Sequence, residues 1–315
     1  MPQPSVESLH LRNDALEVAV LPEVGAKIFS LKSVRTGQEF LWHNPRITPQ
    51  PYPIEANFDN YWCGGWDDGF PTCEACSHNG EVYPNLGELR SVRWSVQKHE
   101  PASLIRLETR GPISPIRAAK EIKLCGGSVE MKYTLTHLGY IPIEFIWGTH
   151  PAYAISPDSI LHIPARKGLV GQASDLALGT PGQVYSWPTV ATSKGSTNMS
   201  RAMPRGKLMA GHYATELSDG WYAIESPQHG SGVLFEFPLD ICPYLWLWLS
   251  YGGWRGYYVA VIEPWTSCPV TLSEAVVANT HRTLNPGETF SCTVRATPWN
   301  APATLQSLLE ERTIR

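Results

Sequence analysis

A carboxylate at the end of an apolar strand is the strongest candidate catalytic group in this sequence. Glu263 closes a run of β-prone, mostly apolar residues and is followed directly by Pro264-Trp265. A carboxylate buried at such a position needs partners, and burial raises its pKa toward that of a useful general base. The alternative is a Glu side chain that reaches solvent beyond the strand. We interpret Glu263 as functional because of the Pro-Trp pair that follows it.

His150 is the second candidate. It lies in Ile146-Trp147-Gly148-Thr149-His150-Pro151-Ala152-Tyr153, between two β-prone runs. Imidazole holds or delivers a proton near neutral pH, which suits general acid or base catalysis. One histidine in a strand-like segment, taken alone, favours a structural role with satisfied hydrogen bonds. The catalytic interpretation therefore depends on which other groups the fold brings beside it.

A third segment combines aromatic rings with adjacent carboxylates. It reads Trp62-Cys63-Gly64-Gly65-Trp66-Asp67-Asp68-Gly69-Phe70-Pro71-Thr72. Aromatic rings stack on the apolar face of a sugar, and carboxylates accept hydrogen bonds from its hydroxyl groups. Trp66, Asp67 and Asp68 are therefore candidate sugar-binding residues. Gly and Asp also form turns, so a simple turn is the alternative.

One cysteine cluster has the spacing of metal ligands. Cys73-Glu74-Ala75-Cys76-Ser77-His78 offers two thiols and an imidazole, but no second CxxC or HxxxH supplies a fourth zinc ligand. The seven cysteines are an odd number and are scattered, which prevents complete pairing in disulfides. We expect reduced thiols in a loop and no metal site.

The elements that must position these residues are strands. Short β-prone segments alternate with turns that contain Gly, Pro or Asn, and this pattern indicates an antiparallel sandwich or barrel. The expected strands include residues 15–21, 27–34, 91–96, 104–109, 119–124, 129–135, 232–237, 257–262 and 289–296. One helix is expected at 303–312, where Leu305, Leu308 and Leu309 share a face. The sequence has no βαβ alternation and no phosphate loop, which argues against a dinucleotide-binding fold.

Composition narrows the class of protein further. The net charge of −4 gives no basic field for nucleic acid or an anionic membrane. No apolar run reaches the roughly 20 residues of a membrane-spanning helix, and Met1-Pro2-Gln3-Pro4 lacks the features of a signal peptide. We therefore expect a soluble, cytoplasmic protein. We also expect a single domain over 1–315, with the polar stretch 168–211 as a long excursion from it.

Five blocks, in order along the chain, resemble the galactose mutarotase-like proteins, the superfamily of the aldose 1-epimerases and glucose-6-phosphate 1-epimerases. Residues 21–28 with 36–42 are similar to the family's opening hairpin, and 64–72, 148–153 and 262–265 are similar to its middle and late blocks. Leu284-Asn285-Pro286-Gly287-Glu288-Thr289 resembles the L-x-P-G-E turn near the family's end. It is the ordered set of five blocks that makes the resemblance fairly specific.

The resemblance implies an all-β fold, a large antiparallel β-sandwich with a sugar cleft across one sheet. In the family's sugar epimerases a Glu takes the proton from the anomeric hydroxyl group while a His protonates the ring oxygen, so the ring opens, rotates and recloses. Carried over, Glu263 is the base and His150 the acid, with no metal and no cofactor. We expect an enzyme, an aldose 1-epimerase-like isomerase whose partner is a small-molecule sugar.

One position departs from the family's pattern. Family members commonly carry a further His in an H-G-x-x-R…W block, and here Leu86 stands before Gly87, with Arg90 and Trp94 in their places. Arg90 is a candidate substrate-binding residue by this match. The missing His favours an alternative function, a carbohydrate-binding protein without catalysis.

Other interpretations stay open at this point. A glycosidase that pairs Asp67 or Asp68 with Glu263 as two carboxylates is ranked last. Arg46, Arg90 and Arg255 are candidate contacts for an anionic substituent on the sugar, and each fits a surface charge equally well.

A late aromatic run, residues 244–254, offers a floor for the expected cleft. Its alternation places Tyr244, Trp246 and Trp248 on one face of a strand, and Leu245, Leu247 and Leu249 on the other. We expect the leucines in the core and the aromatic face, with Trp248 as a substrate-binding residue, in the cleft near Glu263. The alternative is packing of the aromatic face against a neighbouring chain.

Overall fold

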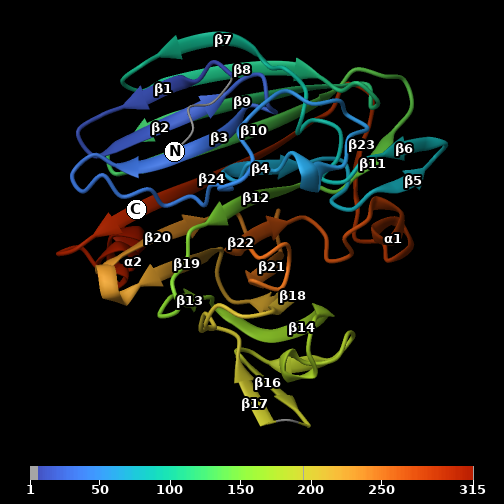
Figure 1. The fold of residues 1–315 in the computed structure, drawn as a ribbon. Coiled ribbons are helices and arrows are strands. Elements are labelled where there is room, and N and C mark those ends of the chain that lie inside the picture. Colours follow the sequence, from blue (N-terminus) through green and yellow to red (C-terminus); the bar gives the residue numbers. More distant parts are fainter. Residues whose placement is uncertain (1–5, 194, 315) are drawn as a thin grey trace.

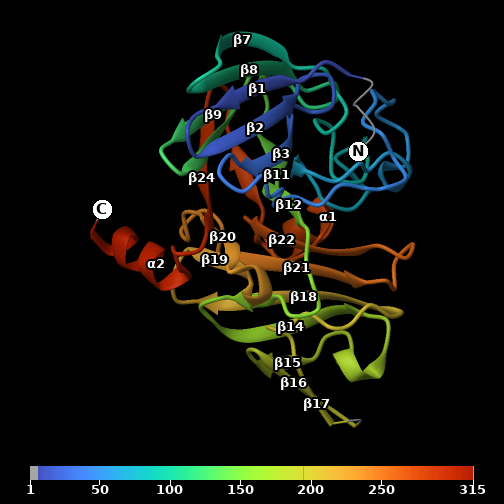
Figure 2. The ribbon, with the colours of Figure 1, turned by 60° about the vertical axis from the view of Figure 1, so that its left-hand side comes forward.

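The computed structural model describes residues 6–193 and 195–314, and most of its regular elements are antiparallel strands (Figures 1 and 2). The largest sheet has ten strands. Their spatial order is β1 (Leu9–Arg12), β2 (Leu16–Leu21), β3 (Lys27–Ser33), β4 (Trp66–Gly69), β12 (Gly148–Tyr153), β22 (Tyr258–Trp265), β21 (Tyr244–Tyr251), β18 (Leu208–Leu217), β14 (Ala165–Ala173) and β15 (Val184–Ser186).

A second sheet has eight strands. Their order is β13 (Ile160–His162), β19 (Trp221–Ser226), β20 (Ser231–Glu236), β24 (Thr289–Asn300), β10 (Ser128–His137), β9 (Ile116–Cys125), β8 (Leu104–Arg110) and β7 (Ser95–Glu100). Three further sheets have two strands each. They pair β5 (Cys76–His78) with β6 (Glu81–Tyr83), β11 (Ile143–Phe145) with β23 (Arg282–Leu284), and β16 (Thr189–Thr192) with β17 (Gly195–Asn198). The helices are α1 (Leu272–Val277) and α2 (Leu305–Ile314), with 3₁₀ turns at Phe58–Asn60, Leu176–Leu178 and Pro227–His229.

The main core lies between the two large sheets. One continuous buried cluster contains Val18 and Leu31 from the ten-stranded sheet together with Ile105, Met131 and Val294 from the eight-stranded sheet. The leucine face of β21 lies in this cluster as well, with Leu245, Leu247 and Leu249 almost fully buried. Each strand contributes alternate side chains to this shared layer, as a sandwich requires. The expected all-β antiparallel sandwich is confirmed.

The other face of the ten-stranded sheet carries a second buried cluster. On β22, Tyr258, Ala260 and Ile262 face the main core, whereas Val261 and Trp265 belong to the second cluster. Loop residues pack over that second face. Because β22 is buried on both faces, its sequence reads as a continuous apolar run rather than an alternating one. A polar side chain on β22 is therefore conspicuous, and Glu263 is that side chain.

The polar stretch 168–211, which we expected to be a long excursion, contains several strands. Its two ends belong to β14 and β18, which are neighbours in the ten-stranded sheet. The chain between them forms β15 and the β16–β17 hairpin, which lie beyond β14 (Figure 2). Val190 and Met199 anchor this hairpin region in the main cluster. Frequent turn residues conceal the strands between β14 and β18, because β15, β16 and β17 are only three or four residues long.

The predicted C-terminal helix forms as α2. Its residues Leu305, Leu308 and Leu309 pack against a small cluster around Trp299 of β24. Among the described residues, no helix is long and apolar enough to cross a membrane.

Candidate active site

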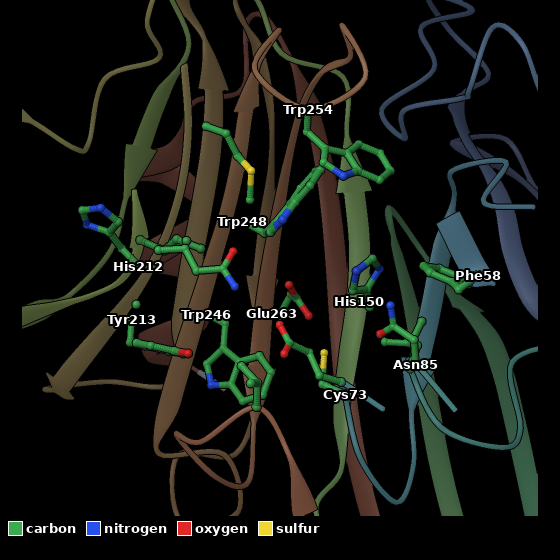
Figure 3. Close-up of a pocket in the computed structure, with 18 of the residues that line it drawn as sticks. Phe58, Cys73, Asn85, His150, His212, Tyr213, Trp246, Trp248, Trp254 and Glu263 are labelled. Carbon is green, nitrogen blue, oxygen red and sulfur yellow. The ribbon is translucent and has the colours of Figure 1, made fainter. Parts of the chain in front are cut away.

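A cavity of about 710 Å³ lies on the second face of the ten-stranded sheet (Figure 3). Four neighbouring strands supply its floor: His150 comes from β12, Glu263 from β22, Trp246 and Trp248 from β21, and Tyr213 from β18. Loops supply the walls. They contribute Phe58, Asp59, Trp62, Cys73, Glu74, Asn85, Leu86, Trp254, Pro269, Val270 and Glu274.

Strand register brings His150 and Glu263 together. Gly148 pairs with Trp265 and Ala152 pairs with Val261, so the antiparallel register places His150 opposite Glu263. Directly opposed residues share a face of the sheet, with Cβ atoms about 4.5–5.5 Å apart. Figure 3 shows both side chains rising from adjacent strands into the same part of the cavity. An imidazole and a carboxylate therefore face one bound molecule together.

The Glu263 carboxylate is nearly buried. It is 3% exposed, and its Oε2 accepts a hydrogen bond of 2.9 Å from the indole Nε1 of Trp265. Its other oxygen has no hydrogen-bond partner among the described residues. Burial raises the pKa of Glu263, while His150 and the Trp265 hydrogen bond oppose the rise. The free oxygen is thus available to accept a proton from a ligand.

Trp265 owes its position to two glycines on the adjacent strands. Gly69 and Gly148 pair with each other, and Gly148 also pairs with Trp265. A Cβ at Gly148 would lie 2.1 Å from the Trp265 ring, and one at Gly69 would lie 2.3 Å from it. The Trp246 ring stacks on the indole at 4.2 Å with an interplanar angle of 10°. The Gly69–Gly148 slot and Trp246 therefore fix the indole, and the indole in turn orients Glu263.

The ring of His150 packs against two aromatic side chains. Its ring meets Trp62 edge-on at 5.7 Å and Phe58 at 6.2 Å between centroids. Its Nδ1 is buried and has no hydrogen-bond partner among the described residues. Burial lowers the pKa of His150, and the negative charge of Glu263 opposes that shift. Protonation therefore depends on the carboxylate beside it.

Trp248 forms part of an aromatic end of the cavity. Its ring meets Trp254 at 5.2 Å and 82°, and it meets Trp62 at 5.8 Å and 85°. Trp248 and Trp254 are both partly exposed, whereas Trp62 is almost fully buried. Two partly exposed indole faces next to the His–Glu pair can stack on a pyranose ring.

Asp67 and Asp68 do not line the cavity. Each is nearly buried and ion-paired, Asp67 with Lys27 at 3.1 Å and Asp68 with Lys120 at 2.6 Å. Burial disfavours the charge of Lys27, but Asp67 and Cys63 more than offset this, and the pKa of Lys27 is raised. The structure thus gives both carboxylates a role in buried ion pairs. It offers no support for sugar contacts by either residue, or for a glycosidase pair with Glu263.

Trp66 and Arg90 also lie behind the cavity. Trp66 is buried in the main core, where its ring lies 5.1 Å from Phe235 and its indole donates to Thr149. Arg90 is 2% exposed and donates from Nη2 to the carbonyl oxygens of Ile54 and Ala56, at 3.2 and 3.1 Å. These hydrogen bonds hold the loop that carries Phe58 into the cavity wall. Neither Trp66 nor Arg90 is among the residues that line the cavity.

The formally charged side chains that line the cavity are acidic. Its lining includes four carboxylates, Asp59, Glu74, Glu263 and Glu274, and no Lys or Arg is among the described residues that line it. Arg46 and Arg255 lie around a separate pocket of about 410 Å³. Arg255 is also near Asp59, at 3.7 Å. A phosphate group on a ligand would therefore find no guanidinium or ammonium group in the cavity lining.

Several solved structures share this arrangement of sheets. A protein of Klebsiella pneumoniae subsp. pneumoniae MGH 78578, proposed to be an aldose 1-epimerase, matches with a TM-score of 0.72 and 14% sequence identity, over 96% of this chain and 81% of its own. A protein from Synechocystis sp. PCC 6803 has a TM-score of 0.69 and 18% identity, over 94% and 96% of the two chains. A galactose mutarotase-like protein from Lactobacillus casei ATCC 334 has a TM-score of 0.66 and 14% identity, over 93% and 100%.

The chain has the galactose mutarotase-like fold. No protein-family model and no curated protein matches the sequence. Similarity at these identities establishes the fold alone, so activity has to be argued from the residues of the site.

Leu86 stands where the family resemblance leads us to expect a histidine. It lines the cavity with a φ of 58°, and its side chain lies against Gly69. The following Gly87 has a φ of 71°, and a Cβ there would lie 1.8 Å from the carbonyl oxygen of Phe70. The wall is therefore apolar at this position. His78 does not replace the missing imidazole, because it pairs with Glu144 at 2.6 Å.

Both cysteines of the Cys73–His78 cluster are free of disulfide bonds. Cys76 donates to the hydroxyl group of Thr72, and Cys73 lies in the cavity wall. Among the described residues, no group of three or more His, Cys, Asp or Glu side chains could hold a metal ion.

Three residues at the site were not singled out from the sequence. Trp62 and Trp254 lie at the ends of the two aromatic segments, where spacing gives no indication of which rings are exposed. Tyr213 belongs to a strand hidden beside the polar stretch, and only recognition of β18 would have placed it in line with Trp246.

Proposed function

We propose that this protein interconverts the α and β anomers of an aldose by general acid–base catalysis. The observation that carries the proposal is the opposed pair of His150 and Glu263 on the cavity floor. One group that can accept a proton and one that can deliver it, on either side of a bound ring, are what ring opening requires.

The proposed reaction begins at the anomeric carbon. The Glu263 carboxylate accepts the proton of the anomeric hydroxyl group as the protonated His150 donates to the ring oxygen. The bond between the anomeric carbon and the ring oxygen breaks, which gives the open-chain aldehyde. Rotation about the neighbouring carbon–carbon bond presents the other carbonyl face. On reclosure the hydroxyl group that attacks the aldehyde returns its proton to His150, and the protonated Glu263 returns its proton to the new anomeric oxygen, so the cycle consumes no other reactant.

The surroundings of the pair support this chemistry. Trp265 holds the Glu263 carboxylate in one orientation, and burial strengthens each charge interaction in the site. Trp248 and Trp254 provide ring faces for stacking against the sugar. Because the cavity lining is acidic and carries no Lys or Arg in the described part of the chain, we propose an aldose without a phosphate group.

The test is anomer exchange across a panel of free and phosphorylated aldoses, followed by polarimetry and by NMR saturation exchange. We expect exchange of at least one unphosphorylated sugar above the uncatalysed rate. Glu263→Gln and His150→Asn should each reduce that rate by roughly 10²–10⁴. The absence of catalysed exchange for every sugar would contradict the proposal, as would unchanged rates in both variants.

A second His–Glu pair supplies the matched control. His162 and Glu225 lie 2.8 Å apart between β13 and β19 of the other sheet, away from the cavity. His162→Asn and Glu225→Gln make the same chemical changes and should leave exchange unaltered. Thermal unfolding of all four variants shows whether any loss reflects the chemistry or the fold.

Leu86 favours a second candidate function, sugar binding without turnover. It presents a methyl-bearing side chain where a further hydrogen-bond donor is expected from the family resemblance. Calorimetry distinguishes the two functions. Binding that survives replacement of both His150 and Glu263, in a protein that exchanges no anomers, would support the binding function instead.

A further inference from the structure

Tyr213 stands in the same row of the sheet as the candidate catalytic pair. It pairs with Trp246, and Trp246 pairs with Glu263 on the next strand. Residues opposed in this way share one face, so Tyr213 reaches the cavity floor from the side opposite His150. Figure 3 shows its hydroxyl group directed toward the part of the cavity where Trp246 and Glu263 lie.

A β-bulge fixes the Tyr213 ring. The register of β14 against β18 shifts between Val170 and Gln172, which leaves Gly171 as the extra residue. A Cβ at Gly171 would lie 2.7 Å from the ring and 3.1 Å from the hydroxyl oxygen of Tyr213. On its other side the ring meets Trp246 at 5.8 Å and 84°. The side chain is therefore held between a bare backbone and an indole.

Two polar side chains at this end of the cavity make no hydrogen bond to the described part of the chain. Neither the Tyr213 hydroxyl group nor the Gln172 amide has a hydrogen-bond partner among the described residues, although both residues line the cavity. Gly171 and Gly211 line it as well, and neither has a side chain to fill the space. Burial, together with Cys268, Cys73, Glu74 and Glu263, raises the pKa of Tyr213, so its hydroxyl group keeps its proton and can donate.

We propose that Tyr213 is a substrate-recognition residue, whose hydroxyl group binds one sugar hydroxyl on the side of the ring away from His150. The Gly171 bulge holds it for that contact, and Gln172 borders the same position. This inference rests on the proposed function in one respect only, that the ligand is a sugar. Tyr213 takes no part in the proton transfers.

The test pairs a protein change with a sugar change. Anomer exchange is measured for wild type and Tyr213→Phe on the best hexose of the panel and on its 2-, 3-, 4- and 6-deoxy derivatives. We expect Tyr213→Phe to lower kcat/KM for the parent hexose by roughly 3- to 30-fold, the effect of one lost hydrogen bond. For one deoxy sugar, which lacks the contacted hydroxyl, the two proteins should give equal values. Equal losses on every sugar, or no loss on any, would overturn the inference.

Two further variants separate recognition from folding. Tyr258→Phe removes the hydroxyl group of a tyrosine on β22 that faces the main core, donates to the carbonyl oxygen of Met203 at 2.6 Å and does not line the cavity; its selectivity among the sugars should match wild type. Gly171→Ala keeps the Tyr213 hydroxyl group but displaces its ring, and it should reproduce the selectivity change of Tyr213→Phe. Wild-type selectivity in Gly171→Ala would contradict the role given to the bulge.

The inference and the proposed function can fail separately. If the wild type exchanges the anomers of no sugar, catalysis fails, and the same comparison is made on dissociation constants from calorimetry. A Tyr213→Phe effect confined to sugars that carry one particular hydroxyl group would then uphold the inference. Dissociation constants that Tyr213→Phe leaves unchanged would overturn it, and the absence of sugar binding would overturn both.

Discussion

The protonation of Glu263 and that of His150 are coupled through their shared burial. Burial disfavours the charged form of each group, so it raises the pKa of the carboxyl group and lowers that of the imidazole. Each charge also stabilises the other. The pair therefore titrates in two macroscopic steps that belong to both residues.

The first prediction concerns the pH dependence of anomer exchange. The base must be deprotonated, so the rate rises with pH through the pKa of Glu263, which is raised from 4.5. The acid must be protonated, so the rate falls with pH through the pKa of His150, which is lowered from 6.5. We expect a narrow bell-shaped profile of kcat/KM with its alkaline limb below pH 6.5. A rate that still climbs from pH 6.5 to 8 would contradict the acid role of His150.

Trp265 gives a second prediction at the scale of single residues. Its hydrogen bond stabilises the Glu263 carboxylate and keeps the pKa of that group from rising further. Trp265→Phe should therefore lower kcat by roughly 10-fold or more, because hydrogen bonds to charged groups contribute about 1.5–3 kcal/mol. It should also move the acid limb of the profile to higher pH. A lower rate with the acid limb unmoved would show that Trp265 acts through packing alone.

The glycine slot is a property of the strands rather than of one residue. Gly69 on β4 and Gly148 on β12 are neighbours across the sheet, and together they leave room for one indole ring. Gly148→Ala should displace Trp265 and destabilise the protein by about 1–3 kcal/mol, the usual cost of overpacking. It should also lower the exchange rate of the folded fraction. Denaturant unfolding and anomer exchange on the same sample measure both effects.

Gly127 provides the control for that substitution. It lies in the turn between β9 and β10, and a Cβ there would meet nothing within 4 Å. Gly127→Ala should leave stability within about 0.5 kcal/mol of wild type and the rate unchanged. A Gly148→Ala variant as stable and active as Gly127→Ala would contradict the slot as the device that orients Glu263.

The element scale also explains which site residues could be predicted from the sequence. Glu263 was visible because a carboxylate interrupts a strand buried on both faces. His150 was singled out as a candidate acid because the block around it resembles the family's pattern. In the structure, strand register places it opposite Glu263. The ion pairs of Asp67 and Asp68 could not be predicted, because their lysine partners lie far away in the sequence, at positions 27 and 120. Adjacent strand residues point to opposite faces, so these two carboxylates could not have lined one cleft.

Some aromatic positions could be predicted from the sequence, and others could not. The alternation of β21 correctly separated its leucines from its tryptophans, because period 2 is a local property of a strand. Trp66 gave no such signal, since its face depends on the position of β4 among its neighbours. Frequent turns and the shortness of β15, β16 and β17 concealed the strands of 168–211. Tyr213, on the adjoining β18, was missed with them.

At the scale of the whole molecule, a buried ion pair joins the two sheets. Lys120 extends from β9 of the eight-stranded sheet to Asp68 on β4, and its ammonium group also donates to the carbonyl oxygen of Gly25 at 2.8 Å. Both side chains are at most 4% exposed. Removing one member of such a pair leaves an uncompensated charge in the core.

The corresponding prediction is a loss of global stability. Lys120→Met should lower the free energy of unfolding by about 3–5 kcal/mol, because Asp68 stays buried without a cation. The double variant Lys120→Met/Asp68→Leu should recover most of that loss. Guanidinium chloride unfolding measures both. A double variant no more stable than Lys120→Met would contradict the ion-pair explanation.

An exposed lysine serves as the comparison. Lys98 on β7 pairs with Glu100 at 2.7 Å, and both side chains are nearly half exposed. Lys98→Met should change the free energy of unfolding by less than about 1 kcal/mol. The contrast between the two lysines then isolates burial as the cause.

The stacked rings of Trp246 and Trp265 provide a spectroscopic probe of the site. Two indoles held 4.2 Å apart in one fixed, asymmetric arrangement should contribute a signal to near-ultraviolet circular dichroism. One of these rings lines the cavity and the other bonds the candidate base. The difference spectrum between wild type and Trp265→Phe would isolate that signal from the other tryptophans. A sugar entering the cavity could then be followed without a label, through the protein's own chromophores.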